Sequence, residues 1–284
     1  MRKTTLLTAS TALLLAAVAA ATAGQGPDDD RLVIDGVEIV TDVAPAPGVP
    51  LERVYSGWRF RSDETQGLQA DDFENPAMVA VEYGIELWET PAGSSGKSCA
   101  DCHGAVEDSM KGLRANMPRW NAAAGEPWTM EDWIDWSVVE HQGAEKWKWE
   151  SEKMLAMTAL IGMQSRGMPM TVQTDGPMAD WVAKGKEIYY TRYGQLDLAC
   201  SNCHEDNYGK FIRADHLSQG NINGFPTYRF KWQGLGSLHR RFKGCMKNIR
   251  AQPFKPGSDE FTALEIYLAS RGAGLGIETP AVRN

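Results

Sequence analysis

Two short stretches decide how this sequence folds: Cys-Ala-Asp-Cys-His at residues 99–103 and Cys-Ser-Asn-Cys-His at residues 200–204. Both read C-x-x-C-H, the pattern by which two thiols on one helical turn attach a haem while the histidine binds its iron. Zinc half-sites and redox dithiols share C-x-x-C, but neither needs the following histidine. We therefore expect two covalently attached haem c groups, with attachment through Cys99, Cys102, Cys200 and Cys203 and iron ligation by His103 and His204.

The sequence around each motif also repeats. The glycines that open Gly-Ile-Glu-Leu-Trp (84–88) and Gly-Lys-Glu-Ile-Tyr (185–189) each lie fifteen residues before the first cysteine of a motif. Further on, apolar helical patterns run toward Gly167 and Gly272, which are expected to cap them. Strand signals are sparse in both halves. The expected fold is mainly α, with two tandem cytochrome c-like domains formed by internal duplication and an extended N-terminal segment.

These signals divide the chain into segments. A basic start, a short apolar run and Ala21-Thr22-Ala23 are typical of a cleaved secretory signal peptide, not of a membrane anchor. No other segment approaches the length of a membrane-spanning helix, so we expect an exported protein without a membrane span. The segments expected are a signal peptide (1–23), an N-terminal extension with a short strand at 32–34 (24–75), a first cytochrome c domain (76–170) and a second one (171–284).

The charge of the chain is unevenly distributed. The net charge is −8, which disfavours nucleic-acid binding. Residues 216–258, however, carry eight Lys or Arg and no Asp or Glu, and the fifth cysteine, Cys245, lies among them. Positive surroundings attract anions and lower the pKa of a thiol. Cys245 is then either an incidental residue on a solvated basic face, or a thiolate held for metal ligation or nucleophilic attack; charge alone leaves these roles open.

The sequence around Cys245 resembles a known family. The stretches Asn-Gly-Phe-Pro-Thr-Tyr-Arg (223–229), Gly-Ser-Leu-His-Arg-Arg-Phe-Lys-Gly-Cys (236–245) and Asn-Ile-Arg-Ala-Gln-Pro (248–253) are similar to the signature of the SoxA family. SoxA proteins are dihaem cytochrome c subunits of the bacterial sulfur-oxidising (Sox) system. The resemblance continues in the first half, at 143–151, and covers nearly all of the chain after the signal peptide.

The resemblance implies a periplasmic L-cysteine S-thiosulfotransferase. SoxA proteins pair with the monohaem cytochrome SoxX and join thiosulfate oxidatively to a cysteine of SoxY, in the SoxYZ carrier, while two electrons pass through haem to a cytochrome acceptor. Carried over to this chain, Cys245 is the catalytic cysteine, found as a persulfide in the family, and the distal ligand of the second haem. Arg241 takes the substrate-binding role, which suits a guanidinium because thiosulfate is a small dianion.

The first half departs from the family pattern, in which a cysteine just ahead of Glu-His-Gln-Gly (140–143) is the distal ligand of the first haem. This chain has no cysteine between His103 and Cys200. His141 is the nearest alternative, since imidazole suits iron, and an open or water-ligated iron is another. Methionine is a third option, although these residues fit helix packing better: Met110, Met117, Met163 and Met168.

Two other functions share part of this pattern. A plain dihaem electron carrier would need no lone thiolate in a basic segment. A thiosulfate dehydrogenase would couple two thiosulfates to tetrathionate without a carrier protein, but the stretches around Cys245 favour the thiosulfotransferase. A cluster of tryptophans in the first half fits packing better than a ligand site: Trp128, Trp133, Trp136, Trp147 and Trp149.

Overall fold

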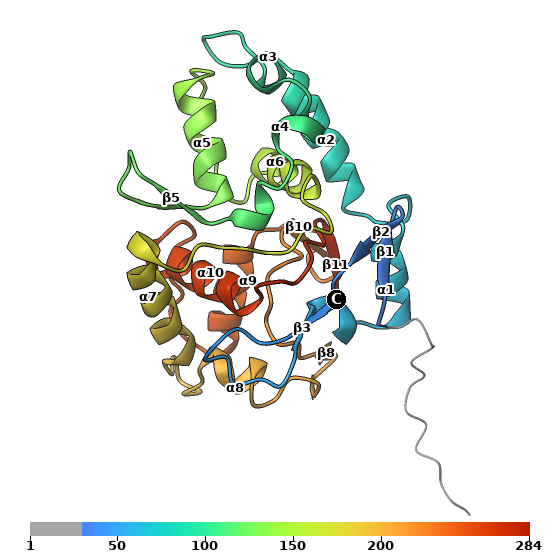
Figure 1. Cartoon of the computed structure of the whole chain (residues 1–284), viewed down its shortest axis with the longest axis vertical. Coiled ribbons are helices and arrows are strands. Elements are labelled where there is room, and N and C mark those ends of the chain that lie inside the picture. Colours follow the sequence, from blue (N-terminus) through green and yellow to red (C-terminus); the bar gives the residue numbers. More distant parts are fainter. Residues whose placement is uncertain (1–29) are drawn as a thin grey trace, which may run out of the picture.

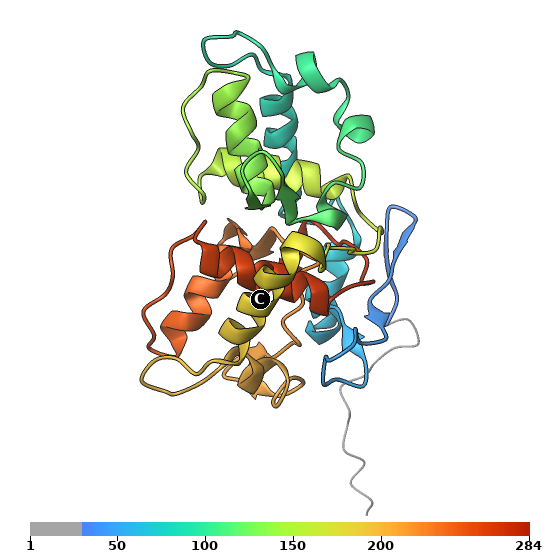
Figure 2. The same ribbon diagram turned by 60° about the vertical axis from the view of Figure 1, so that its left-hand side comes forward.

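The computed structural model describes residues 30–284, so the signal peptide expected at residues 1–23 lies outside the described part. The chain forms two stacked lobes, and an N-terminal segment packs along the lower one (Figures 1 and 2). We call the upper one, from α2 to α6, the first lobe, and the lower one, from α7 to β11, the second lobe. Within residues 30–284, none of the helices is both long and apolar enough to cross a bilayer.

The first lobe is built around a crossing of two helices, α2 and α6. A Cβ atom on Gly84 would lie 2.7 Å from the carbonyl oxygen of Ala156, so only glycine lets α2 approach α6 this closely. The elements of the lobe are α2 (Met78–Glu89), α3 (Cys99–His103), α4 (Val106–Ser109), β5 (Arg119–Asn121), β6 (Glu126–Trp128), α5 (Met130–Glu140) and α6 (Glu152–Met163), with a 3₁₀ turn at Arg114–Asn116.

The second lobe repeats this crossing with α7 and α10. Here a Cβ atom on Gly185 would lie 2.0 Å from the carbonyl oxygen of Ala263. In its three-stranded sheet, β9 pairs antiparallel with β10 and parallel with β11. The elements of the lobe are α7 (Ala179–Tyr190), α8 (Cys200–His204), β7 (Phe211–Ile212), β8 (Asp215–His216), β9 (Thr227–Arg229), β10 (Gly234–Gly236), α9 (Leu238–Asn248), α10 (Asp259–Arg271) and β11 (Ala281–Arg283).

The N-terminal segment covers the second lobe. The Tyr55 amide donates to Gln219 at 2.7 Å, and Gln69 accepts from the Val282 amide at 3.1 Å. The strand expected at 32–34 is confirmed, but the other elements of this segment were not predicted, since their strands are too short to show alternation. They are β1 (Leu32–Ile34), β2 (Val37–Ile39), β3 (Asp42–Val43), β4 (Val54–Tyr55) and α1 (Asp63–Ala70).

The two closing helices end differently. Helix α10 ends at Arg271 with Gly272 as its C-cap, as the sequence predicts. Helix α6 ends at Met163 with Gln164 as its C-cap, so the expectation that Gly167 caps it was wrong. The physical reason is a long-range contact, because the Gly167 amide donates to the Ile277 carbonyl at 2.9 Å instead. This hydrogen bond joins the backbone after α6 to the backbone just before β11. The described part of the chain as a whole is helical with many short strands.

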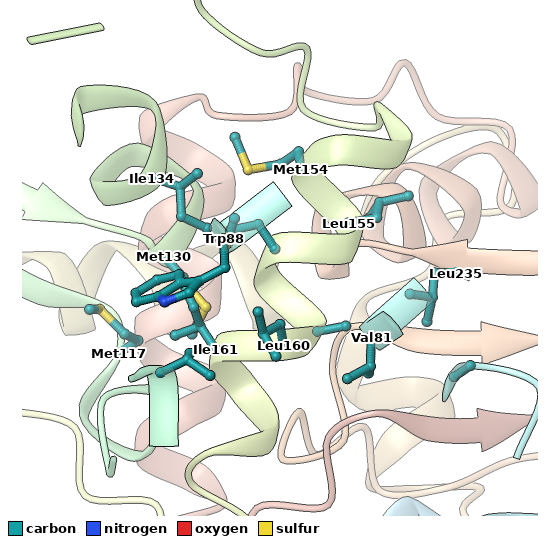
Figure 3. Close-up of a cluster of buried hydrophobic side chains, with 14 of the residues drawn as sticks. Val81, Trp88, Met117, Met130, Ile134, Met154, Leu155, Leu160, Ile161 and Leu235 are labelled. Carbon is teal, nitrogen blue, oxygen red and sulfur yellow. The ribbon is translucent and has the colours of Figure 1, made fainter. Parts of the chain in front are cut away.

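The hydrophobic core of the first lobe reaches into the second. Most of its side chains come from α2, α5 and α6, and Leu235 joins them from β10 of the second lobe (Figure 3). Met117 and Met154 are fully buried in this core. Burial of each large apolar side chain stabilises by about 1.5–3 kcal/mol. The shared core therefore holds the lobes in one arrangement.

Candidate active site

Both C-x-x-C-H motifs form single helical turns that are capped by their own middle residues. At α8 the side chain of Asn202 accepts a hydrogen bond from the Ala199 amide at 2.9 Å. At α3 the Asp101 carboxylate accepts from the Ser98 amide at 2.7 Å, and these Ser98 hydrogen bonds lower the pKa of Asp101. None of the five cysteines forms a disulfide within residues 30–284. Each motif therefore presents two thiols and an imidazole from a rigid turn.

His204 of the second motif is held in a fixed orientation. Its Nδ1 donates to the Ser218 carbonyl at 2.7 Å. Gly220 lets this segment approach, since a Cβ atom there would lie 3.0 Å from the imidazole ring. The hydrogen bond fixes which ring nitrogen carries the proton, and the other nitrogen stays available as a ligand. This arrangement suits a proximal haem ligand.

Cys245 lies on α9 and faces the second motif. Burial alone would raise the pKa of its thiol, but the charge of Arg241, hydrogen bonding to the His204 ring and the charge of Arg229 together lower that pKa to about 7. Arg241 precedes Cys245 by one helical turn, so both lie on one face of α9. Burial, and then the neighbouring Cys245, raise the pKa of Cys200 to about 12. The thiol and the motif therefore form one site.

Two further arginines approach this site from other parts of the chain. Arg229 on β9 is buried and makes an ion pair with Asp215 at 3.4 Å. Burial, followed by the charge of Arg241, lowers the pKa of Arg229 to about 10. Burial, together with Arg283 and Arg229, lowers the pKa of Arg61 to about 9. These cations repel one another, so an anionic group beside them would be stabilised.

A cavity of about 370 Å³ is lined by α9 residues on both sides of Cys245 in the sequence, Arg241, Gly244 and Lys247 among them, but not by Cys245 itself. Six basic side chains and a single carboxylate, that of Glu150, line it; the basic ones are Arg229, Lys231, Arg240, Arg241, Lys243 and Lys247. All six belong to the acid-free segment seen in the sequence. A pocket of this charge concentrates small anions.

The first lobe supports the N-terminal end of α9. The Ser237 hydroxyl, which caps α9, donates to the Glu150 carboxylate. Trp149 stacks on His239 with ring centroids 4.8 Å apart, and the Nε2 of His239 lies 3.2 Å from the Glu265 carboxylate. The helix that carries Cys245 is thereby positioned by residues of both lobes. This contact agrees with a packing role for Trp149.

The first motif has different surroundings. Gln142, which follows α5, donates to the Cys99 sulfur at 3.7 Å. His103 is exposed and lies against Trp88, with ring centroids 5.7 Å apart. His141 is the exposed C-cap of α5 and meets the Trp136 ring edge-on at 4.6 Å. Of the methionines considered as ligands, Met117 lies in the buried core, Met110 and Met163 pack against it, and Met168 packs against the second-lobe core.

The donor set in both lobes fits haem c. Each turn offers two thiols and one imidazole in the order that attachment requires. In the second lobe, the buried Nε of Arg61 has no hydrogen-bond partner within the protein, and the cations around it suit the carboxylates of a haem. A thiol faces the imidazole only in the second lobe, where Cys245 lies on α9.

Comparison with known proteins decides the family. Residues 83–170 match the model of the SoxA/TsdA cytochrome c domain. The chain is 52% identical to the L-cysteine S-thiosulfotransferase subunit SoxA of Paracoccus pantotrophus, over 97% of this chain and 96% of that protein. The chain belongs to the SoxA family. The corresponding SoxA of Rhodovulum sulfidophilum is 51% identical, with 94% of each chain covered.

A solved structure of the SoxA family agrees with this fold. The crystal structure of SoxXA from P. pantotrophus matches with a TM-score of 0.86 and 52% identity, covering 89% of this chain and 97% of that chain. The resemblance read from residues 223–253 is thus confirmed.

Sequence reasoning missed Arg61, Ser218 and Gly220 as parts of the site. No local pattern marks them, because long-range folding brings them to the site.

Proposed function

We propose that this chain is the catalytic dihaem subunit of a periplasmic L-cysteine S-thiosulfotransferase. In this proposal it conjugates thiosulfate to a cysteine of SoxY within the SoxYZ carrier. The observation that carries the proposal is Cys245, a half-buried thiol with its pKa lowered to about 7, on the helix that supplies four of the six basic side chains lining the cavity. The names of the SoxA relatives support the same activity.

The side chains around Cys245 have separate roles in this reaction. Arg241 and the lysines of the cavity bind the thiosulfate dianion, and a guanidinium can hold two of its oxygens. Overall, the carrier thiol and thiosulfate form an S–S bond and release one proton and two electrons. Cys245 is the sulfur at which transfer takes place, since its lowered pKa keeps a large fraction as thiolate near pH 7.

Electron removal in this proposal uses haem c held at both motifs. Cys99, Cys102, Cys200 and Cys203 would attach the haems, His103 and His204 would bind the irons as proximal ligands, and Cys245 would bind the second iron as its distal ligand. When bound, haem c supplies one-electron acceptors through which two electrons can leave toward a cytochrome acceptor. A SoxX subunit is the proposed partner, in line with the SoxXA crystal structure.

The two haem sites lie in domains that we assign to residues 76–170 and 171–284, derived from one another by duplication. Both domains place a glycine where two helices cross, at Gly84 and Gly185. Both also close the loop before the motif with a β-bridge, Ala92 with Lys97 and Tyr193 with Leu198. Residues 24–75 form the extension, and the signal peptide at 1–23 directs export to the periplasm.

The test is the variant Cys245→Ala in the complex with SoxX. We expect it to keep both haems and to lose formation of thiosulfate-conjugated SoxY, measured by intact mass spectrometry of SoxYZ after incubation with thiosulfate and an oxidised cytochrome. Normal conjugation by this variant would contradict the proposal. Tetrathionate formation by the native complex without SoxYZ would instead indicate a thiosulfate dehydrogenase, and electron transfer without any thiosulfate chemistry would indicate a plain carrier.

A further inference from the structure

Helices α5 and α9 correspond residue by residue when counted from their first turns. Thr129 caps α5 with its side chain, and Ser237 caps α9 in the same way. The eighth residue after the cap is Ser137 in α5 and Cys245 in α9. By this count a hydroxyl stands in the first lobe where the second lobe has its reactive thiol.

The C-terminal ends of these helices give the same correspondence. The residue after Ser137 accepts a hydrogen bond from the Ala144 amide at 3.1 Å, and the residue after Cys245 accepts one from the Ala251 amide at 2.9 Å. Ala144 and Ala251 also correspond to each other, because each lies against the glycine of a motif loop, Gly93 or Gly194. The loop that follows is one residue longer in the first lobe, since Ala144 lies seven residues after Ser137 and Ala251 six after Cys245, so the agreement is in which carbonyl accepts the hydrogen bond.

The end of α5 also lies next to the first motif. Gln142, five residues after Ser137, contacts the Cys99 sulfur at 3.7 Å. Ser137 is half-buried, as Cys245 is. The alternative ligand His141 is exposed and its ring packs against Trp136, which is itself 41% exposed. Ser137 is thus the side chain of α5 that takes the place of Cys245.

The charge of α5 determines which external ligand this position suits. The helix carries four acidic residues and no Lys or Arg, whereas α9 carries four basic residues and no acid. An anion is therefore disfavoured near Ser137. A small neutral nitrogen ligand that binds iron is the chemical class that fits.

We propose that Ser137 occupies the distal position of the first haem site and leaves its iron open to a small neutral ligand such as imidazole. This inference rests on the two haem sites of the proposed function. The second site is closed to the same ligand because Cys245 takes that position there.

The experiment is an imidazole titration of the oxidised holoprotein, followed by EPR. We expect imidazole to change the signal of one haem and to leave the thiolate-type low-spin signal of the other as it was. Ser137→Cys is expected to add a second thiolate-type signal and to abolish the response to imidazole. The matched control Val139→Cys, which places the thiol on another face of α5, is expected to behave as the native protein, and so is His141→Ala.

Several results would overturn the inference while leaving the proposed function intact. One is a native protein that carries two haems but does not respond to imidazole. The others are a Ser137→Cys variant with the native spectrum and a His141→Ala variant with an altered spectrum. The haem count, from pyridine haemochrome absorbance and intact mass, separates a failure of this inference from a failure of the proposed function. One haem per chain would contradict the dihaem assignment itself and the inference with it.

Discussion

Helices α5 and α9 have matching places in the two lobes but opposite charge. Helix α5 carries four acidic residues, helix α9 four basic residues, and each follows a C-x-x-C-H turn in the chain. The shared framework is therefore compatible with two kinds of site. Only in the second lobe do the charges favour an anion and a thiolate beside it. The difference teaches that helices of matching position can differ in chemistry through a few side chains.

The lobes also differ in how firmly the motif turn is anchored. In the second lobe Glu205, directly after His204, pairs with Arg271 of α10, and the Arg271 side chain is 1% exposed. In the first lobe the residue after His103 is Gly104, which has no side chain to anchor. His204 is accordingly half-buried and His103 exposed. Of the two motif turns, the second is the one followed by a residue in a buried ion pair.

The largest effect on stability is expected from breaking this anchor. Arg271→Ala removes one partner of a buried ion pair and should lower the free energy of unfolding by about 3–5 kcal/mol. Gln164→Ala, at the end of α6, is the matched control and should cost less than about 1 kcal/mol, since its side chain bonds only to its own helix. Urea unfolding of both holoproteins measures the difference. An equal loss of unfolding free energy in Arg271→Ala and Gln164→Ala would show that the two lobes are anchored alike.

The next effect is expected at Arg241, to which the proposed function assigns thiosulfate binding. Arg241→Gln should raise KM for thiosulfate about 10–100-fold, because a charge-assisted hydrogen bond contributes about 1.5–3 kcal/mol. Loss of this charge also raises the pKa of Cys245, so the pH below which the rate falls should move upward from about 7. A pH series of kcat/KM measures both effects.

The neighbouring arginine supplies the control for Arg241. Arg240 lies 4.5 Å over the Trp232 ring and 3.9 Å from the Glu150 carboxylate, so part of its charge is already engaged. Arg240→Gln should therefore change KM for thiosulfate less than Arg241→Gln, and leave the pH profile near that of the native protein. Equal effects from both variants would mean that the basic cavity acts only through its total charge.

A pH-dependent effect on stability concerns the first turns of α5 and α9 near Glu265. The Nε2 of His239 in α9 lies 3.2 Å from the Glu265 carboxylate, whereas burial, and then the charge of Glu265, raise the pKa of Glu131 in α5 to about 8. The folded protein thus holds a proton on Glu131 that the unfolded chain releases above pH ~4.5. Stability contributed by this proton is lost as pH rises from there, and the loss is complete above pH ~8.

Glu131→Gln should therefore stabilise the protein above pH ~8 and have little effect below pH ~4.5. One unit of pKa shift corresponds to about 1.4 kcal/mol, so even part of this shift is measurable. Thermal unfolding across the pH range gives the comparison, with Glu140→Gln at the exposed end of α5 as control. A gain that is the same at every pH would rule out titration of Glu131 as its cause.

Much of this organisation can be predicted from the sequence because it depends on local patterns. The C-x-x-C-H turns, the glycines at 84 and 185 and the one-turn spacing of Arg241 and Cys245 are all readable within a few residues. Strands of two or three residues show no period, so apart from the strand at 32–34 the sheets of the N-terminal segment could not be predicted. Arg61 and Ser218 reach the second site only through tertiary folding. The equivalence of Ser137 and Cys245 likewise required the positions of the helix caps.

The most direct test of the comparison exchanges the two residues, in the double variant Ser137→Cys/Cys245→Ser. It keeps the number of thiols and both attachment motifs but moves the thiol from the basic helix to the acidic one. The measurement is the initial rate of thiosulfate-dependent haem reduction in the complex with SoxX and SoxYZ. The account predicts a loss of at least about 100-fold in this rate, with both haems still attached. A rate near that of the native complex would contradict the claim that Cys245, in its arginine-lined site, carries the chemistry.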